Sequence, residues 1–259
     1  MEETVLVQDG GDIVTVVLNR PEKLNALTKP MWKRLGEVFT ELSASEKVRC
    51  VVIRGAGTKA FAPGNDISEF ANERSNVEQA RAYGAIMRHT ITAIDLCRHP
   101  IVAQIHGICV GGGLEIAGLA DIRICGVSSR FGVPVKNLGL VEAYDELAAM
   151  MRVVGRAAAL ELLLEGRIWN AREAYEKGLV NRVVGDGGVM DEARATAQRI
   201  AEGAPLAARW HKKFVRRLAD PRPLSEAEFD ESYACFDTED FREGVAAFLD
   251  KRKPQFKGK

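Results

Sequence analysis

The sequence lacks the features that mark several common classes of protein. Its 36 lysine and arginine residues balance its 36 aspartate and glutamate residues, so the formal net charge is zero. This balance provides no general attraction to nucleic acid. No apolar run reaches the roughly 20 residues of a transmembrane helix, and residues 1–4 are acidic and polar, unlike a secretory or transit peptide. We therefore expect neither a nucleic-acid partner nor a membrane partner.

Cysteine and histidine are scarce, and their spacing indicates no metal site. The five cysteines include no Cys-x-x-Cys pair, and the four histidines do not have the spacing of metal ligands. Three of the cysteines lie in apolar runs. We interpret them as reduced core residues of a cytoplasmic protein, because disulfides persist mainly in oxidising compartments.

The most distinctive segment is the glycine-dense stretch of residues 107–115, which follows the apolar run Ile101–Ile105. It predicts a buried strand, a tight turn and the first turn of a helix. Three consecutive glycines, residues 111–113, let the backbone approach a ligand with no Cβ in the way. The helix start leaves N–H groups unpaired, and the carboxylate of Glu115 stands beside them. This combination suits a reaction that forms an oxyanion and moves a proton next to it.

Phosphate-binding motifs do not fit this stretch. A dinucleotide fingerprint that uses Gly111 and Gly113 would need a third glycine where Ile116 stands. A P-loop that begins at Gly107 would need a lysine where the sequence has Gly113. The alternative that stays open is tight packing of a helix on a strand, without chemistry.

A second strand-to-helix turn is expected after residues 51–55. Pro63 and Gly64 break regular structure, and Asn65 and Asp66 can cap the short helix that the next residues indicate. The backbone N–H of Asn65 is then free to bind a ligand. By itself this turn indicates only a change of chain direction.

Five segments together resemble the crotonase (enoyl-CoA hydratase/isomerase) superfamily. Residues 61–67 are similar to its F-x-A-G-A-D-[IL] segment, and residues 106–123 to its N-G-x-x-x-G-G-G-x-E-L segment. The other three are residues 18–27, 155–184 and 239–254. They occur in the expected order and at the expected spacing over nearly the whole chain.

The order of elements predicts an α/β fold followed by helices. The residues favour strands at 4–8, 13–18, 48–54, 101–105 and 122–125, helices at 29–43, 77–97 and 113–120, a loop at 133–140, and an almost wholly helical section after Tyr144. The resemblance implies more: a crotonase-like spiral of β-β-α turns in residues 1–200, and a helical region in residues 201–259 that forms a homotrimer, commonly paired into a hexamer.

The resemblance also implies an oxyanion hole made by the N–H groups of Asn65 and Gly112, which would bind the carbonyl of an acyl-CoA thioester. Loss of one such donor typically costs about 3 kcal/mol. No separate cofactor is expected, because coenzyme A is part of the substrate. The implied substrate and CoA contacts are Lys23, Ala26, Ala62, Pro63, Gly64, Asn65, Asp66, Ile67, Gly111, Gly112, Phe248 and Lys251. The last two are three residues apart and are expected on one face of a helix, from which they would reach a neighbouring subunit's CoA.

The acid–base residues depart from the family pattern. Family hydratases use two glutamates, of which Glu115 corresponds to the first. Val135 stands at the second position and cannot transfer a proton. An acidic cluster follows, and we expect Glu142 or Asp145 to provide the second group. The alternative is a solvated helix start, in which Asp145 and Glu146 are first-turn acids that the helix dipole favours.

The predicted activity is that of an acyl-CoA enzyme that stabilises an enolate, either an enoyl-CoA hydratase or an enoyl-CoA isomerase. Decarboxylation, thioester hydrolysis and C–C cleavage pass through the same kind of enolate and are the first alternative. The second alternative is a CoA-binding or RNA-binding member with little catalytic activity, which Val135 would explain.

Overall fold

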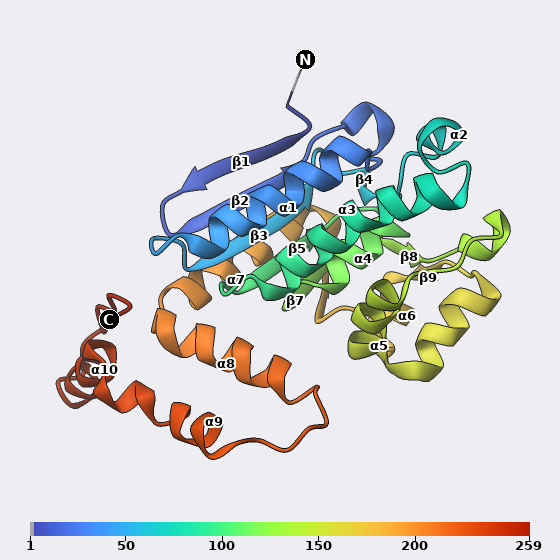
Figure 1. Cartoon of the computed structure of the whole chain (residues 1–259). Helices are drawn as coiled ribbons and strands as arrows, with labels where there is room; N and C mark the ends of the chain where they lie inside the picture. Colours follow the sequence, from blue (N-terminus) through green and yellow to red (C-terminus); the bar gives the residue numbers. More distant parts are fainter. Residues whose placement is uncertain (1–2) are drawn as a thin grey trace.

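In the computed structural model, which describes residues 3–259, the strands form two sheets (Figure 1). The six-stranded sheet has the order β1 (Val5–Gly10), β2 (Ile13–Leu18), β3 (Cys50–Gly55), β5 (Ile101–Ile105), β7 (Ile122–Gly126) and β10 (Arg182–Val184). Only β1 runs antiparallel to its neighbour. The four-stranded sheet has the order β4 (Ala60–Ala62), β6 (Ile108–Val110), β8 (Arg130–Gly132) and β9 (Trp169–Asn170).

The chain alternates between the two sheets as it advances. Three successive pairs of strands have one member in each sheet: β3 and β4, β5 and β6, and β7 and β8. Each pair is followed by a helix: α3 (Val77–Leu96) after the first pair, α4 (Gly112–Gly118) after the second and α5 (Tyr144–Glu165) after the third. This is the expected spiral of β-β-α turns. The remaining short elements are η1 (Pro21–Lys23), η2 (Ile67–Glu69), α2 (Phe70–Glu73), η3 (Val135–Leu138), α6 (Ala171–Glu176), η4 (Asp186–Gly188) and η5 (Ala234–Asp237).

Helices cover both faces of the six-stranded sheet. Alternate side chains of a strand point to opposite faces, so Val51 and Ile53 of β3 join a core with α1 (Lys29–Ala44) and α3, whereas Cys50 and Val52 pack against α7 (Val189–Ala201). Strands buried on both faces read as continuous apolar runs, which is why β3 and β5 are evident in the sequence.

The beginning of α1 is fixed by local sequence. Thr28 is its N-cap, and the Thr28 hydroxyl accepts a hydrogen bond from the N–H of Met31 at 3.4 Å. Pro30 fits the first turn, where a missing N–H costs nothing. The helix buries Met31, Trp32, Leu35, Val38, Phe39 and Leu42, a spacing that gives one continuous apolar face.

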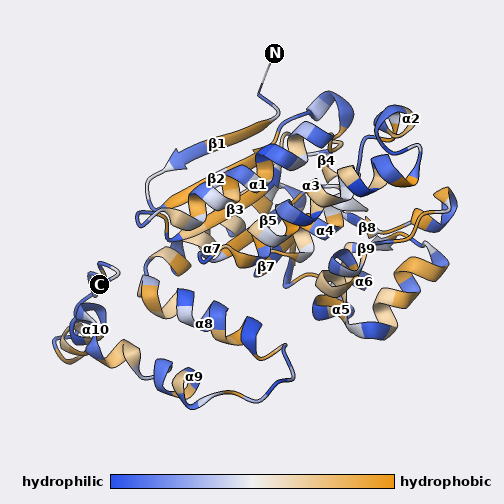
Figure 2. Ribbon diagram, in the orientation of Figure 1, coloured by the Kyte–Doolittle hydropathy of each residue, from blue (hydrophilic) through white to orange (hydrophobic). Residues whose placement is uncertain are grey.

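The last three helices extend away from the sheets (Figure 1). They are α8 (Pro205–Arg217), α9 (Glu226–Glu231) and α10 (Glu239–Leu249). Figure 2 shows hydrophobic residues interspersed with hydrophilic ones along these helices. Several large apolar side chains here are exposed, among them Val215, Leu218, Phe229, Tyr233, Phe248 and Leu249. None of the helices among the described residues has both the length and the apolar character needed to cross a bilayer.

The expectation that Phe248 and Lys251 share a helical face is wrong. The helix α10 ends at Leu249, and Lys251 adopts a left-handed conformation with φ of 54°. The Lys251 N–H donates to Phe248 O at 3.3 Å, and the Arg252 N–H donates to Ala247 O at 3.0 Å. This pair of bonds is a Schellman motif, which terminates the helix before Lys251.

Candidate active site

The two predicted turns meet backbone to backbone between β4 and β6. A Cβ added at Gly113 would lie 2.2 Å from Ala62 O, and one added at Gly64 would lie 3.4 Å from the nitrogen of Gly112. Both Gly64 and Gly111 have positive φ, 106° and 51°. Only glycine allows this approach and these conformations, so the glycines that dominate the sequence pattern serve to bring the two turns together.

Asn65 and Gly112 present free backbone N–H groups at this junction. The Leu27 N–H donates to Gly64 O at 2.9 Å, and the Asp66 N–H donates to Leu27 O at 2.8 Å. This parallel bridge turns the N–H of Asn65 to the opposite side from Leu27. Gly112 is the first residue of α4 and has no intrahelical acceptor. Both residues line one cavity of about 200 Å³.

The side chain of Asn65 ties this turn to helix α1. The Trp32 Nε1–H donates to Asn65 Oδ1 at 2.6 Å, and Trp32 is fully buried. The following residue, Asp66, accepts hydrogen bonds from the Ser68 N–H at 3.1 Å and from Arg20 Nη1 at 3.0 Å. Hydrogen bonding with Ser68 lowers the pKa of Asp66, and Arg20 adds to this effect. The turn is therefore held from both sides.

We expect Asn65→Ala to change the kcat of the reaction at this site by no more than about threefold, because the backbone N–H of residue 65 remains. The same change leaves the buried indole N–H of Trp32 without an acceptor, which should lower the free energy of unfolding by about 1–3 kcal/mol. Steady-state kinetics and urea unfolding measure the two effects. In the double variant Asn65→Ala/Trp32→Phe, the loss of folding stability should be smaller than the sum of the losses in the two single variants. A hundredfold drop in kcat for Asn65→Ala would place the side chain in the chemistry.

Three carboxyl groups face the same cavity. Glu115 lies in α4, Glu142 precedes α5, and Glu146 lies in the first turn of α5. One carboxylate oxygen of each residue lies within 4.8 Å of the other two. Burial raises the pKa of each of the three carboxyls well above its ordinary value. Charge from the neighbouring carboxylates adds to the rise. Three such groups cannot all be ionised near neutral pH, so the cluster offers a proton donor beside a proton acceptor.

Glu115 has the most constrained environment of the three. Its Oε2 atom is buried and has no hydrogen-bond partner among residues 3–259. Burial is the main cause of its raised pKa, and a hydrogen bond from Glu142 opposes part of the rise. A buried oxygen without a partner lowers the stability of the fold, and a catalytic role is one reason for a protein to retain it.

The comparisons with known proteins agree with this geometry. The family model described as enoyl-CoA hydratase/isomerase matches residues 8–259. The chain belongs to the enoyl-CoA hydratase/isomerase family.

Relatives and solved structures of this family match the chain over nearly its full length. A short-chain-enoyl-CoA hydratase of Clostridium acetobutylicum is 33% identical over 251 residues, 96% of this chain and 95% of the relative. A probable enoyl-CoA hydratase of Mycobacterium tuberculosis is 37% identical over 257 residues, 98% of each chain. The crystal structure of an enoyl-CoA hydratase/carnithine racemase from Magnetospirillum magneticum is 53% identical, with a TM-score of 0.98 over 100% of this chain and 97% of that one.

The fold brings together part of the set of acids proposed from the sequence. Glu115 and Glu142 line the cavity, and Val135 contributes an apolar wall to it. Asp145 is not among the lining residues and forms an ion pair with Arg88 at 3.3 Å. Glu146, interpreted from the sequence as a first-turn acid, does cap α5 by accepting the Ala143 N–H at 2.5 Å. It also reaches the cavity. Helical spacing from Glu142 could not have indicated this, because Glu142 lies before the N-cap of α5.

The predicted substrate contacts occupy three locations. Pro63, Gly64, Asn65, Ile67, Gly111 and Gly112 line the cavity. Ala62 is fully buried behind it, and the ion pair between Arg20 and Asp66 holds the segment of Lys23 and Ala26 beside the turn. Phe248 and Lys251 belong to the C-terminal helical region, where Phe248 lines a separate cavity with Trp210 and Phe241. Their role at a neighbouring subunit stays a prediction.

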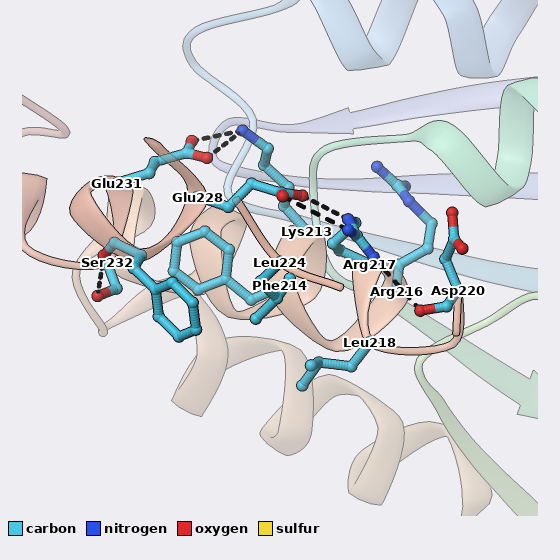
Figure 3. A pocket seen from close by; sticks show the side chains of 11 residues that line it. Lys213, Phe214, Arg216, Arg217, Leu218, Asp220, Leu224, Glu228, Glu231 and Ser232 are labelled. Carbon is cyan, nitrogen blue, oxygen red and sulfur yellow. Dashed lines mark hydrogen bonds and ion pairs between the residues drawn. The ribbon is translucent and has the colours of Figure 1, made fainter. Parts of the chain in front are cut away.

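A larger cavity of about 520 Å³ lies between α8 and α9 (Figure 3). Its charged side chains are largely used in contacts within the chain: Lys213 pairs with Glu231, and Arg217 with Glu228. Phe214, Leu218 and Leu224 supply apolar lining. Among residues 3–259, the one group of three carboxyls within 4.8 Å of one another lines the smaller cavity, which is therefore the candidate active site.

Proposed function

We propose that the protein catalyses the addition of water to a 2-enoyl-CoA thioester. The observation that carries this proposal is the presence of two free backbone N–H groups and a cluster of three close carboxyl groups in one cavity. Hydration needs both: the donors bind the thioester oxygen as it gains charge, and the carboxyls exchange protons with water and carbon. The names of the hydratase relatives support the same reaction.

Each group has a defined part in the reaction. The thioester oxygen accepts hydrogen bonds from the N–H groups of Asn65 and Gly112. In its ionised form Glu115 takes a proton from water, whose oxygen forms a bond to the β carbon while the electron pair of the C=C bond moves toward the thioester oxygen to give an enolate. Glu142, in its protonated form, then delivers a proton to the α carbon. The proton gained by Glu115 returns to Glu142 through the cluster, so no net proton is consumed.

Family hydratases have a second glutamate where this chain has Val135. Proton transfer within the carboxyl cluster would take over the role of that glutamate. Glu142 lies near both Glu115 and Glu146, and burial raises its pKa so that a neutral acid persists near pH 7. The same carboxyls could move a proton from one carbon of an enoyl chain to another, which would be isomerisation. The names of the hydratase relatives favour hydration over isomerisation.

Assays with two thioesters test this proposal. We expect crotonyl-CoA to lose its enoyl-thioester absorbance in the ultraviolet, with kcat in the range of about 1–10³ s⁻¹ that is usual for enzymes. A 3-enoyl-CoA should give no comparable gain of that absorbance. Conversion of the 3-enoyl-CoA without hydration of crotonyl-CoA would establish an isomerase instead. Turnover of neither thioester would contradict the proposed activity.

We also propose that the chain assembles into a homotrimer through its C-terminal helices. The exposed apolar residues on α8 to α10 support this arrangement, because monomers rarely leave so many large apolar side chains in water. Phe248 is 82% exposed in the single chain. In the assembly it would be covered by a neighbour or by the CoA that the neighbour binds.

A further inference from the structure

Arg74 is a cation held on the wall of the active-site cavity. It follows α2, and its backbone N–H donates to Phe70 O at 3.0 Å. Its guanidinium carbon lies 4.8 Å from the ring centroid of Phe70 and 5.0 Å from that of Tyr83. Tyr83 is fully buried, and its hydroxyl donates to Glu69 at 3.3 Å. Two rings in contact with one guanidinium restrict its position and orientation.

The protein leaves the hydrogen-bond donors of this guanidinium unused. Arg74 makes no ion pair within 4.0 Å and no side-chain hydrogen bond with any of residues 3–259. Both Arg74 and Phe70 nevertheless line the cavity that contains Glu115 and Gly112. A planar group with several free donors is well suited to bind a carboxylate.

The size of the cavity limits the ligand that can reach Arg74. Its volume is about 200 Å³, which at roughly 30 Å³ per water-sized group holds about six or seven heavy atoms. A five-carbon acyl chain that ends in a carboxylate contributes about six heavy atoms beyond its thioester carbonyl, so it fits this space. An uncharged five-carbon chain contributes about four heavy atoms beyond the carbonyl, so it would fill less of the volume and would leave Arg74 unpaired.

We propose that Arg74 selects short 2-enoyl-CoA substrates that carry a carboxylate at the far end of the acyl chain. The proposal rests on the hydratase function proposed above and defines its substrate class. The carboxyl cluster does not prevent such binding, because burial and mutual repulsion keep part of it protonated. Asn65 and Gly112 fix one end of the acyl group, and Arg74 fixes the other.

A different role for Arg74 is that of a counter-ion to the cluster. Its charge lowers the pKa of Glu115 and of Glu142, against the larger effect of burial. A counter-ion would act equally on every substrate, since it would alter only the protonation of the cluster. A carboxylate-binding residue would instead change the ratio of rates between a charged and an uncharged substrate.

The test compares 2-pentenoyl-CoA with the five-carbon 2-enoyl-CoA in which a carboxylate replaces the terminal methyl group. We expect kcat/KM of the wild-type protein to be at least about tenfold higher for the carboxylated thioester. Arg74→Met should lower this ratio by about 10–100-fold, because the charge-assisted hydrogen bonds are lost. Arg74→Lys keeps the charge without the planar donors and should give an intermediate ratio.

Arg81→Met is the matched control, since Arg81 is an exposed arginine on α3 that does not line the cavity. It should leave the ratio unchanged. Equal kcat/KM for the two thioesters in the wild type, or a ratio that Arg74→Met does not alter, would overturn the proposal while leaving the hydratase function intact. Turnover of neither thioester by the wild type would refute the hydratase function and this substrate class together.

Discussion

Replacement of Glu115 by Gln is expected to lower kcat for hydration of crotonyl-CoA by about 10²–10⁴-fold, the usual contribution of a positioned acid–base group. The glutamine side chain would keep the shape of the glutamate but could not accept a proton from water. Because Glu115 would act on the acyl group, which free coenzyme A does not carry, the dissociation constant for CoA should be unchanged. Stopped-flow or steady-state kinetics and isothermal titration calorimetry measure these two quantities.

The same variant also has an expected effect on stability that excludes misfolding as the cause. The folded-state pKa of Glu115 is raised by burial, so the folded protein binds this proton more tightly than the unfolded chain. The stabilisation from that proton is present at low pH and is lost as pH rises through the raised pKa. Glutamine does not titrate, so Glu115→Gln should gain stability relative to the wild type between about pH 5 and pH 9. An unchanged kcat of Glu115→Gln with crotonyl-CoA would show that Glu115 takes no part in the proton transfers.

Gly113→Ala is expected to have the second large effect. The new Cβ would lie 2.2 Å from Ala62 O and 2.9 Å from the Ala62 Cβ, so β4 must move. Overpacking of this kind costs about 1–3 kcal/mol of folding stability. The displaced strand leads directly into the turn of Asn65, and a shift of about 1 Å there can lower kcat by about 100-fold. Thermal unfolding and kinetics with crotonyl-CoA measure the two losses.

Gly118→Ala is the matched control in the same helix. A Cβ at Gly118 meets no atom within 4 Å, and its φ is not in the left-handed region. Alanine in place of glycine in a helix stabilises it by up to about 1 kcal/mol, so this variant should retain activity and stability. If Gly113→Ala behaved like Gly118→Ala, the close contact between the two turns would not determine the site.

Long local patterns were the part of the structure that the sequence could predict. Strands β2 and β5 have the expected bounds, and α1, α3 and α4 begin and end within two residues of expectation. The two strands are mostly apolar, α1 and α3 have N-cap side chains, and α4 begins at the triple glycine. The second sheet was missed. Its strands have two or three residues each, too few to show a period of two, and they exist only because neighbouring turns of the spiral pair them.

The candidate site divides in the same way. The triple glycine and Glu115 lie within one segment, so local chemistry was enough to predict an oxyanion site there. Glu146 and Arg74 were not predicted to be part of the site. Their contribution depends on which side chains meet across the cavity, and Arg74 lies 41 positions before Glu115 in the sequence. No local sequence pattern shows that two residues so far apart in the chain line one cavity. A charged residue near a helix end is usually exposed to water.

The most direct test of the account is a crystal structure with a non-reactive enoyl-CoA analogue bound. We expect its thioester oxygen to lie about 2.7–3.1 Å from the backbone nitrogens of both Asn65 and Gly112, with the α carbon facing Glu142 and the β carbon facing Glu115. A thioester bound with its oxygen away from either nitrogen, or an acyl group in the cavity between α8 and α9, would contradict the account.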